Sequence, residues 1–89
     1  MGRIDTMILT GRCAMDIRCM ESYKKLGLNI AYYRKANGLS QEKLAELVGI
    51  SRTHMSRIET AECAVSLDVV FLICSALSIT PDKLFSFRD

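Results

Sequence analysis

The sequence has few chain-breaking residues and no long apolar run. One proline and five glycines among 89 residues leave little room for long connections between secondary-structure elements. No apolar stretch reaches the eighteen or so residues that a membrane-spanning helix needs. The N-terminus also lacks the sustained apolar core of a signal peptide. These absences predict a cytoplasmic protein without a membrane segment.

Cysteine, histidine and catalytic patterns are also sparse. The four cysteines (Cys13, Cys19, Cys63 and Cys74) include no CxxC pair, so we expect free thiols that act as small hydrophobic residues. The single histidine, His54, has no cysteine at a zinc-binding spacing. Paired carboxylates, a phosphate-binding glycine loop and a nucleophile constellation are missing as well. We therefore predict a protein that is not an enzyme, with no cofactor, metal or small-molecule ligand.

The chain is long enough for one domain, and its charge is unevenly distributed. About half of the residues are hydrophobic and a quarter are charged, as in folded domains. Residues 23–57 carry seven cations and two anions, a net charge of +5, whereas residues 58–89 carry two cations and five anions, a net charge of −3. The basic middle favours a face that binds a polyanion.

From about Tyr23 onward, apolar residues recur at helical spacing and predict five helices. The first helix carries Tyr23, Leu26, Ile30 and Tyr33 on one face. The expected start and stop signals are three capping serines, two glycines and one Thr-Pro-Asp sequence: Ser40, Ser51, Ser66, Gly38, Gly49 and Thr80-Pro81-Asp82. This pattern predicts a compact all-α domain over residues 21–89.

Residues 1–20 have a different pattern, and we expect them to be an N-terminal arm or leader, separate from the domain. In CAMDIRCM, from Cys13 to Met20, the alternation has a period of two and predicts a strand. RIDTMIL is weakly strand-like and Thr10-Gly11 could form a turn, so a β-hairpin is one interpretation. A leader or a disordered arm ahead of Met20 is the other, and the residues alone favour neither.

Residues 39–59, LSQEKLAELVGISRTHMSRIE, contain two short helical patterns on either side of Gly49. Ala45 is small enough to let the two helices approach closely, and Gly49 can end the first helix in a left-handed conformation. The outer side of the second helix carries residue types that contact bases and phosphates: Arg52, Thr53, Ser56 and Arg57.

LSQ, LA, GIS and SRIE at their mutual spacing, followed by SLD and PDKLF, resemble the helix-turn-helix of the phage repressor/Cro (XRE) family. The resemblance covers about residues 26–85. It implies a five-helix lambda-repressor-like domain that binds operator DNA as a dimer. The helix from Arg52 to Glu59 would then enter the major groove.

The resemblance also implies individual roles for residues at matching positions. Base contacts are implied for Arg52, Thr53, Ser56 and Arg57. Phosphate contacts are expected from a glutamine, a serine and two lysines of the basic middle: Gln41, Ser51, Lys43 and Lys35. A partly buried ion pair between Arg34 and Glu59 would tie the first helix to the third.

The loop after SRIE departs from the family pattern. A glycine usually stands where this chain has Ala61. A left-handed alanine costs about 1 kcal/mol, so we expect this loop to take another path. Glu62 would also repel phosphate, which weakens the expectation of a backbone phosphate contact here.

Residues 67–77, LDVVFLICSAL, are apolar almost all round, so the helix needs cover on more than one side. Our hypothesis is that residues 1–20 or a second subunit pack over Phe71 and Leu72. Phe85 and Phe87 are further candidates for a dimer surface, with capping of the monomer's own core as the alternative.

These patterns together predict a sequence-specific transcriptional regulator, a repressor that binds a palindromic operator in double-stranded DNA as a homodimer. An antitoxin or a restriction-modification controller is an alternative within DNA binding. A protein-interaction module that has kept the fold and lost DNA binding is an alternative from another class. Glu62 and the missing loop glycine favour that module, whereas Gln41, Arg52 and Arg57 oppose it.

Overall fold

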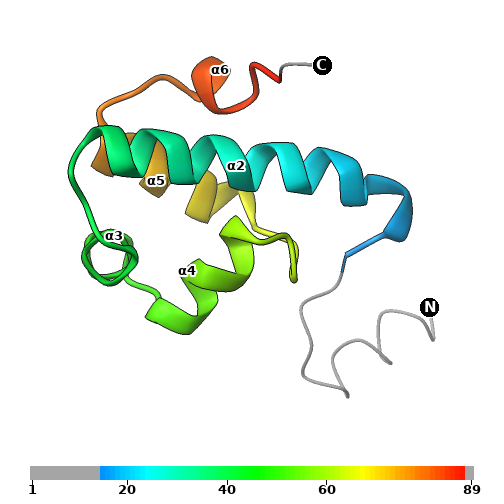
Figure 1. Cartoon of the computed structure of the whole chain (residues 1–89), viewed down its shortest axis with the longest axis horizontal. Helices are drawn as coiled ribbons and strands as arrows, with labels where there is room; N and C mark the ends of the chain where they lie inside the picture. Colours follow the sequence, from blue (N-terminus) through cyan, green and yellow to red (C-terminus); the bar gives the residue numbers. More distant parts are fainter. Residues whose placement is uncertain (1–14, 88–89) are drawn as a thin grey trace.

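The computed structural model describes residues 15–87, which form one 3₁₀ turn and five α-helices and contain no strand (Figure 1). The elements are η1 (Ile17–Cys19), α2 (Met20–Ala36), α3 (Gln41–Val48), α4 (Arg52–Glu59), α5 (Leu67–Leu77) and α6 (Pro81–Leu84). Figure 1 shows the long α2 crossing the molecule, with α3 and α4 on one side of it and α6 on the other. The predicted all-α, five-helix fold is confirmed.

Local capping explains where most of the helices begin. Ser40, Ser51 and Ser66 are the N-caps of α3, α4 and α5, and each Oγ accepts a hydrogen bond from the backbone N–H three residues later, at 3.0, 3.0 and 3.2 Å. These three predictions are confirmed. Thr80 precedes α6, but its side chain makes no capping bond, so the helix start rests on Pro81 at the first helical position.

The core lies between α2, the α3–α4 pair, α5 and α6. Its largest fully buried side chains come from all five helices: Ile30, Leu44, Met55, Ile73, Leu77 and Leu84. Cys63 and Cys74 are buried among them as small hydrophobic residues, as expected, and burial raises the pKa of the Cys74 thiol. Cys19 is a free thiol, as expected, but it is exposed and does not belong to the core.

The predicted strand is wrong for residues 15–20. Asp16 caps a 3₁₀ turn here: its Oδ1 accepts a hydrogen bond from the backbone N–H of Arg18 at 2.9 Å, and its Oδ2 lies 2.6 Å from Nη2 of Arg18. The contacts lower the pKa of Asp16, and the turn runs directly into α2. A local cap needs no partner segment, whereas a strand does. RIDTMIL and Thr10-Gly11 lie outside the described residues.

The loop after α4 contains a left-handed turn at Ala61. Ala61 has φ +61°, so the expectation of another path is wrong. The N–H of Ala61 donates to the carbonyl of Ile58 at 3.2 Å, and that of Glu62 donates to the carbonyl of Arg57 at 2.8 Å. These are the two bonds of a Schellman motif, and they satisfy carbonyls at the end of the helix.

A second left-handed turn, at Ser78 after the end of α5, allows the energetic cost of such a turn to be measured. Ser78 is exposed and has φ +56°. We expect Ser78→Gly to raise the free energy of unfolding by about 0.5–1 kcal/mol, because glycine avoids the Cβ clash of the left-handed conformation although it loses more chain entropy. Urea denaturation measures the change.

The matched control for Ser78→Gly is Gly49→Ala, the reverse exchange. Gly49 has φ +89°, and no atom would lie within 4 Å of an added Cβ, so only the backbone conformation is tested. We expect a loss of about 1 kcal/mol. If both variants changed stability in the same direction, this account of the left-handed turns would be wrong.

Candidate nucleic-acid interface

Helices α3 and α4 form a helix-turn-helix whose tight turn is set by Ala45 and Gly49. The N–H groups of Gly49 and Ile50 both donate to the carbonyl of Ala45, at 2.8 and 3.0 Å. Ala45 is buried, and Gly49 takes the left-handed conformation predicted for it. The chain therefore turns within Gly49, Ile50 and Ser51 before α4 begins.

The two sides of α4 differ sharply in burial. Met55, Ile58 and Glu59 face the interior. The other side carries the four candidate base-contacting residues, of which three are exposed and Ser56 is half-buried: Arg52, Thr53, Ser56 and Arg57. Pairs four residues apart in this set (52 with 56, 53 with 57) lie one above the other on a helix. The structure thus brings all four to one face.

A buried polar cluster holds the inner side of α4. Nε of Arg34 lies 2.7 Å from Oε2 of Glu59, and its Nη2 donates to Oε1 at 3.2 Å. The two side chains are only 9% and 5% exposed. Nη1 of Arg34 also donates to the carbonyl of Leu39 at 2.7 Å. The ion pair that the resemblance implied is therefore present, and it ties α2 to the end of α4.

Gln41 belongs to the same cluster, which the sequence did not reveal. Its Nε2 donates to Oε1 of Glu59 at 2.9 Å, and the side chain is half-buried at the start of α3. We name Arg34, Gln41 and Glu59 the Arg34–Glu59 cluster. Because its members come from α2, α3 and α4, the cluster fixes the position of α4 relative to the two helices beside it.

Gly27 is a second feature that sequence reasoning missed. It is buried in α2, and a Cβ added there would lie 2.4 Å from the carbonyl oxygen of Glu59. The backbone of α2 therefore packs directly on the end of α4. The signal available in the sequence was a glycine in the middle of a helix, where it costs about 1 kcal/mol relative to alanine without a packing reason.

The remaining phosphate candidates lie around the start of the motif. Ser51 is exposed, and its Oγ accepts the capping bond of α4. Lys43 is exposed and its Nζ lies 3.0 Å from Oε1 of Glu46, a surface pair that is worth little and that a phosphate could replace. Lys35 is exposed in the last turn of α2.

An acidic residue borders this surface. Glu62 is exposed just beyond α4, and the hydroxyl of Thr60 donates to its Oε2 at 2.9 Å. The same hydroxyl lies 3.0 Å from the carbonyl of Ser56. The hydroxyl thus holds a carboxylate at the edge of the polar face of α4, where it disfavours close approach of a phosphate.

Metal-ligand clusters and membrane-spanning helices are both absent from the described part of the chain. Within residues 15–87, no three histidine, cysteine or acidic side chains converge on a point where a metal could bind. In the same range, no helix combines the length and apolarity that crossing a membrane would take.

Comparison with protein families identifies the family to which the α3–α4 helix-turn-helix belongs. The helix-turn-helix family HTH_3 matches residues 30–84, which include the whole of α3, α4 and α5. This chain belongs to that helix-turn-helix family. The predicted resemblance to the XRE type is confirmed, and the chain is a DNA-binding transcriptional regulator.

Individual relatives agree with the family. The control protein C.SmaI of Serratia marcescens is 36% identical over 74 residues, which are 83% of this chain and 82% of that protein. The restriction-modification controller protein C.AhdI of Aeromonas hydrophila has a similar structure, with a TM-score of 0.69 and 38% identity over 71% of this chain and 96% of that one. The P22 c2 repressor in complex with a synthetic operator has a TM-score of 0.62 and 29% identity, over 66% and 89% of the two chains.

Proposed function

We propose that this regulator is a cytoplasmic repressor that reads operator sequence in the major groove with α4. The observation that supports the proposal is the exposed face of α4, with Arg52, Thr53 and Arg57 outside and the Arg34–Glu59 cluster holding the helix from inside. Arginine can bond O6 and N7 of guanine together, and threonine can contact a base edge or the thymine methyl group.

Phosphate contacts would set the register of α4 on the duplex. Ser51, Lys35 and Lys43 are exposed near the turn and the start of the motif, where they can neutralise or bond backbone phosphates without reading sequence. Gln41 uses one donor on Glu59, and its amide has a second N–H that could bond a phosphate. In this proposal Gln41 links the phosphate backbone to the base-reading helix.

We further propose that the chain acts as a homodimer. A single small domain makes few contacts, and a dimer of helix-turn-helix domains binds two half-sites about 34 Å apart on a roughly palindromic operator. Phe71 and Leu72 on α5 are 53% and 49% exposed, so residues 15–87 leave them uncovered. Adjacent large apolar side chains of this kind favour a protein contact, and a second copy is the partner that we assign to them.

One observation favours a more specific function than repression in general, namely that of a restriction-modification controller. C.SmaI and C.AhdI are named as controllers, and both exceed 35% identity to this chain. The proposal predicts that the bound operator lies beside genes for a restriction endonuclease and a methyltransferase. Sequencing genomic fragments that the protein captures would test it.

Selection of bound fragments from random DNA tests the reading role of α4. We expect an enriched palindrome and binding that weakens steeply with salt. Arg52→Ala should cost about 1–3 kcal/mol of binding free energy and relax the preference at one base position in each half-site. Fluorescence anisotropy with the selected operator measures the affinity.

Two control variants separate base reading from the loss of a positive charge and from sequence-independent phosphate contacts. Lys83→Ala removes one cation from α6, away from the polar face of α4, and should leave the selected sequence unchanged. Gln41→Ala should weaken binding to all sequences alike. If no sequence were enriched and binding did not depend on salt, the chain would instead be a protein-interaction module.

A further inference from the structure

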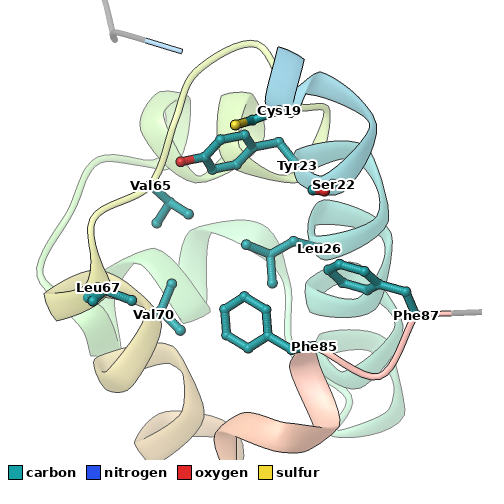
Figure 2. A pocket seen from close by; sticks show the side chains of 9 residues that line it. All are labelled: Cys19, Ser22, Tyr23, Leu26, Val65, Leu67, Val70, Phe85 and Phe87. Atoms are coloured by element: carbon teal, nitrogen blue, oxygen red, sulfur yellow. The ribbon is translucent and has the colours of Figure 1, made fainter. Parts of the chain in front are cut away.

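Pockets with different linings open on either side of the long helix α2. The pocket between the first half of α2, the start of α5 and the C-terminal tail has a volume of about 360 Å³ and is lined by no charged side chain. Figure 2 shows Leu26 and Phe85 pointing into it and Tyr23 lying across its upper end. Such a lining can bury apolar groups, but it offers little to fix the orientation of a ligand.

A more polar pocket, with a volume of about 270 Å³, lies between α2 and α6. Because α6 and α4 are on opposite sides of α2 (Figure 1), this pocket faces away from the candidate DNA-reading helix. We name it the α2–α6 pocket. One of its walls belongs to α2, and the other belongs to α6 and the C-terminal tail. Its lining residues are Leu28, Asn29, Tyr32 and Tyr33 on the first wall and Lys83 and Ser86 on the second.

The two walls of the α2–α6 pocket are joined by hydrogen bonds. Nδ2 of Asn29 donates to the carbonyl of Leu84 at 2.8 Å and to the carbonyl of Ser86 at 3.3 Å. The ring of Tyr32 meets that of the half-buried Tyr33 edge to face, with the centroids 5.0 Å apart, so the exposed ring is restrained. The walls are therefore positioned before a ligand binds, which lowers the entropic cost of binding.

Lys83 gives the α2–α6 pocket a positive charge that no carboxylate within residues 15–87 neutralises by an ion pair. Lys35, Arg52 and Arg57 also lack such a partner, but they lie on the proposed DNA-binding surface. Lys83 is on the opposite side of α2 from α4, where DNA bound along α4 would not reach it (Figure 1). Its charge is thus available to a different anion.

We propose that the α2–α6 pocket binds a small molecule that carries a carboxylate beside an aromatic ring. The carboxylate would accept hydrogen bonds from Nζ of Lys83 and from the hydroxyl of Ser86, which are both exposed residues. The ring would lie against Leu28 and Tyr32, whose side chains are 68% and 57% exposed. The volume of the pocket lies just below the range for drug-sized ligands, so a ligand with a single ring fits best. This inference does not depend on DNA binding.

Titration of the isotope-labelled full chain with benzoate, followed by amide chemical shifts in NMR spectra, tests the proposal. We expect a dissociation constant of about 1 mM, as is reasonable for so small a ligand. The largest shifts should occur at the side-chain amide of Asn29 and the backbone amides of Lys83 and Ser86. Benzyl alcohol keeps the ring and acetate keeps the carboxylate, and each should bind about tenfold more weakly than benzoate because each loses one of the two contacts.

Variants at exposed positions separate the pocket from general attraction of an anion to a basic protein. Lys83→Gln and Tyr32→Ala should each weaken benzoate binding by about fivefold or more, because they remove the charge and the ring contact. Lys24→Gln is the matched control for charge: Lys24 is an exposed cation of α2 that does not line the pocket, so its loss should leave the affinity unchanged. The dispersion of the amide spectrum checks that each variant is folded.

Three results would overturn the proposal. The first is the absence of shifts at Asn29, Lys83 and Ser86 at benzoate concentrations about tenfold above the expected dissociation constant. The second is an equal affinity of the Lys83→Gln and Lys24→Gln variants for benzoate. The third is an equal affinity of the parent chain for benzoate and benzyl alcohol, since the carboxylate would then contribute nothing.

Discussion

Replacing Glu59 by alanine is expected to lower the free energy of unfolding by about 3–5 kcal/mol, because the change leaves the buried guanidinium of Arg34 without its counter-charge. The side chain of Arg34 is only 9% exposed, so water cannot replace the carboxylate without opening the structure. The variant also leaves the amide of Gln41 without its acceptor. Urea denaturation followed by circular dichroism measures the loss.

A double-mutant cycle tests whether the charge imbalance is the cause. Arg34→Met alone should also be strongly destabilising, because it leaves the carboxylate of Glu59 buried beside only the amide of Gln41. Arg34→Met combined with Glu59→Leu should cost less than either single change, since no buried charge remains. If the two single losses simply added in the double variant, the pair would not be acting as a unit.

The same variants separate the stability of the fold from the reading of DNA. Glu59 does not lie on the polar face of α4, so the double variant keeps Arg52, Thr53 and Arg57 exposed. Where it is folded, it should select the same operator sequence as the parent chain. Reduced affinity with an unchanged sequence preference would place the Arg34–Glu59 cluster in positioning α4.

Local signals made much of the fold predictable from the sequence. A capping serine bonds a backbone N–H three residues away, so Ser40, Ser51 and Ser66 could be identified without knowledge of the rest of the chain. The spacing of Ala45 and Gly49 within LSQEKLAELVGISRTHMSRIE likewise predicted the tight turn that the structure contains.

The predictions from the sequence were wrong where two local effects of similar size compete. The alternation over residues 15–20 suited a strand, but the Asp16 cap and the start of α2 form without any partner segment. At Ala61, the cost of a left-handed alanine is about 1 kcal/mol, comparable to the two backbone hydrogen bonds that the turn gains. Effects of similar size cannot be ranked from residue type alone.

The inner support of the candidate site depends on how the helices cross. The bond from Gln41 to Glu59 joins α3 to α4, and the contact at Gly27 joins α2 to α4. Neither follows from periodicity, which identifies the face of a helix but not the distance between two backbones. The polar face of α4 was predictable because it depends on one helix only.

Gly27→Ala should therefore destabilise the protein although alanine is the better helix former. Helix propensity alone predicts a gain of about 1 kcal/mol at this position. The new Cβ would meet the carbonyl oxygen of Glu59 at 2.4 Å and that of Ile58 at 2.8 Å, and backbone atoms cannot rotate away. Overpacking of this kind typically costs about 1–3 kcal/mol or more, and we expect a net loss of about 2 kcal/mol.

The sign of the change in stability caused by Gly27→Ala shows whether helix propensity or overpacking dominates at this position. Thermal and urea denaturation should both show the loss, whereas Leu28→Ala, an exposed neighbour on the same helix, should change stability little. A gain in stability for Gly27→Ala would mean that α2 and α4 can separate without cost. The added Cβ should also displace α4 relative to α2. We therefore expect the Gly27→Ala variant to lose operator affinity even under conditions where it is fully folded, although Arg52 and Arg57 are both still present.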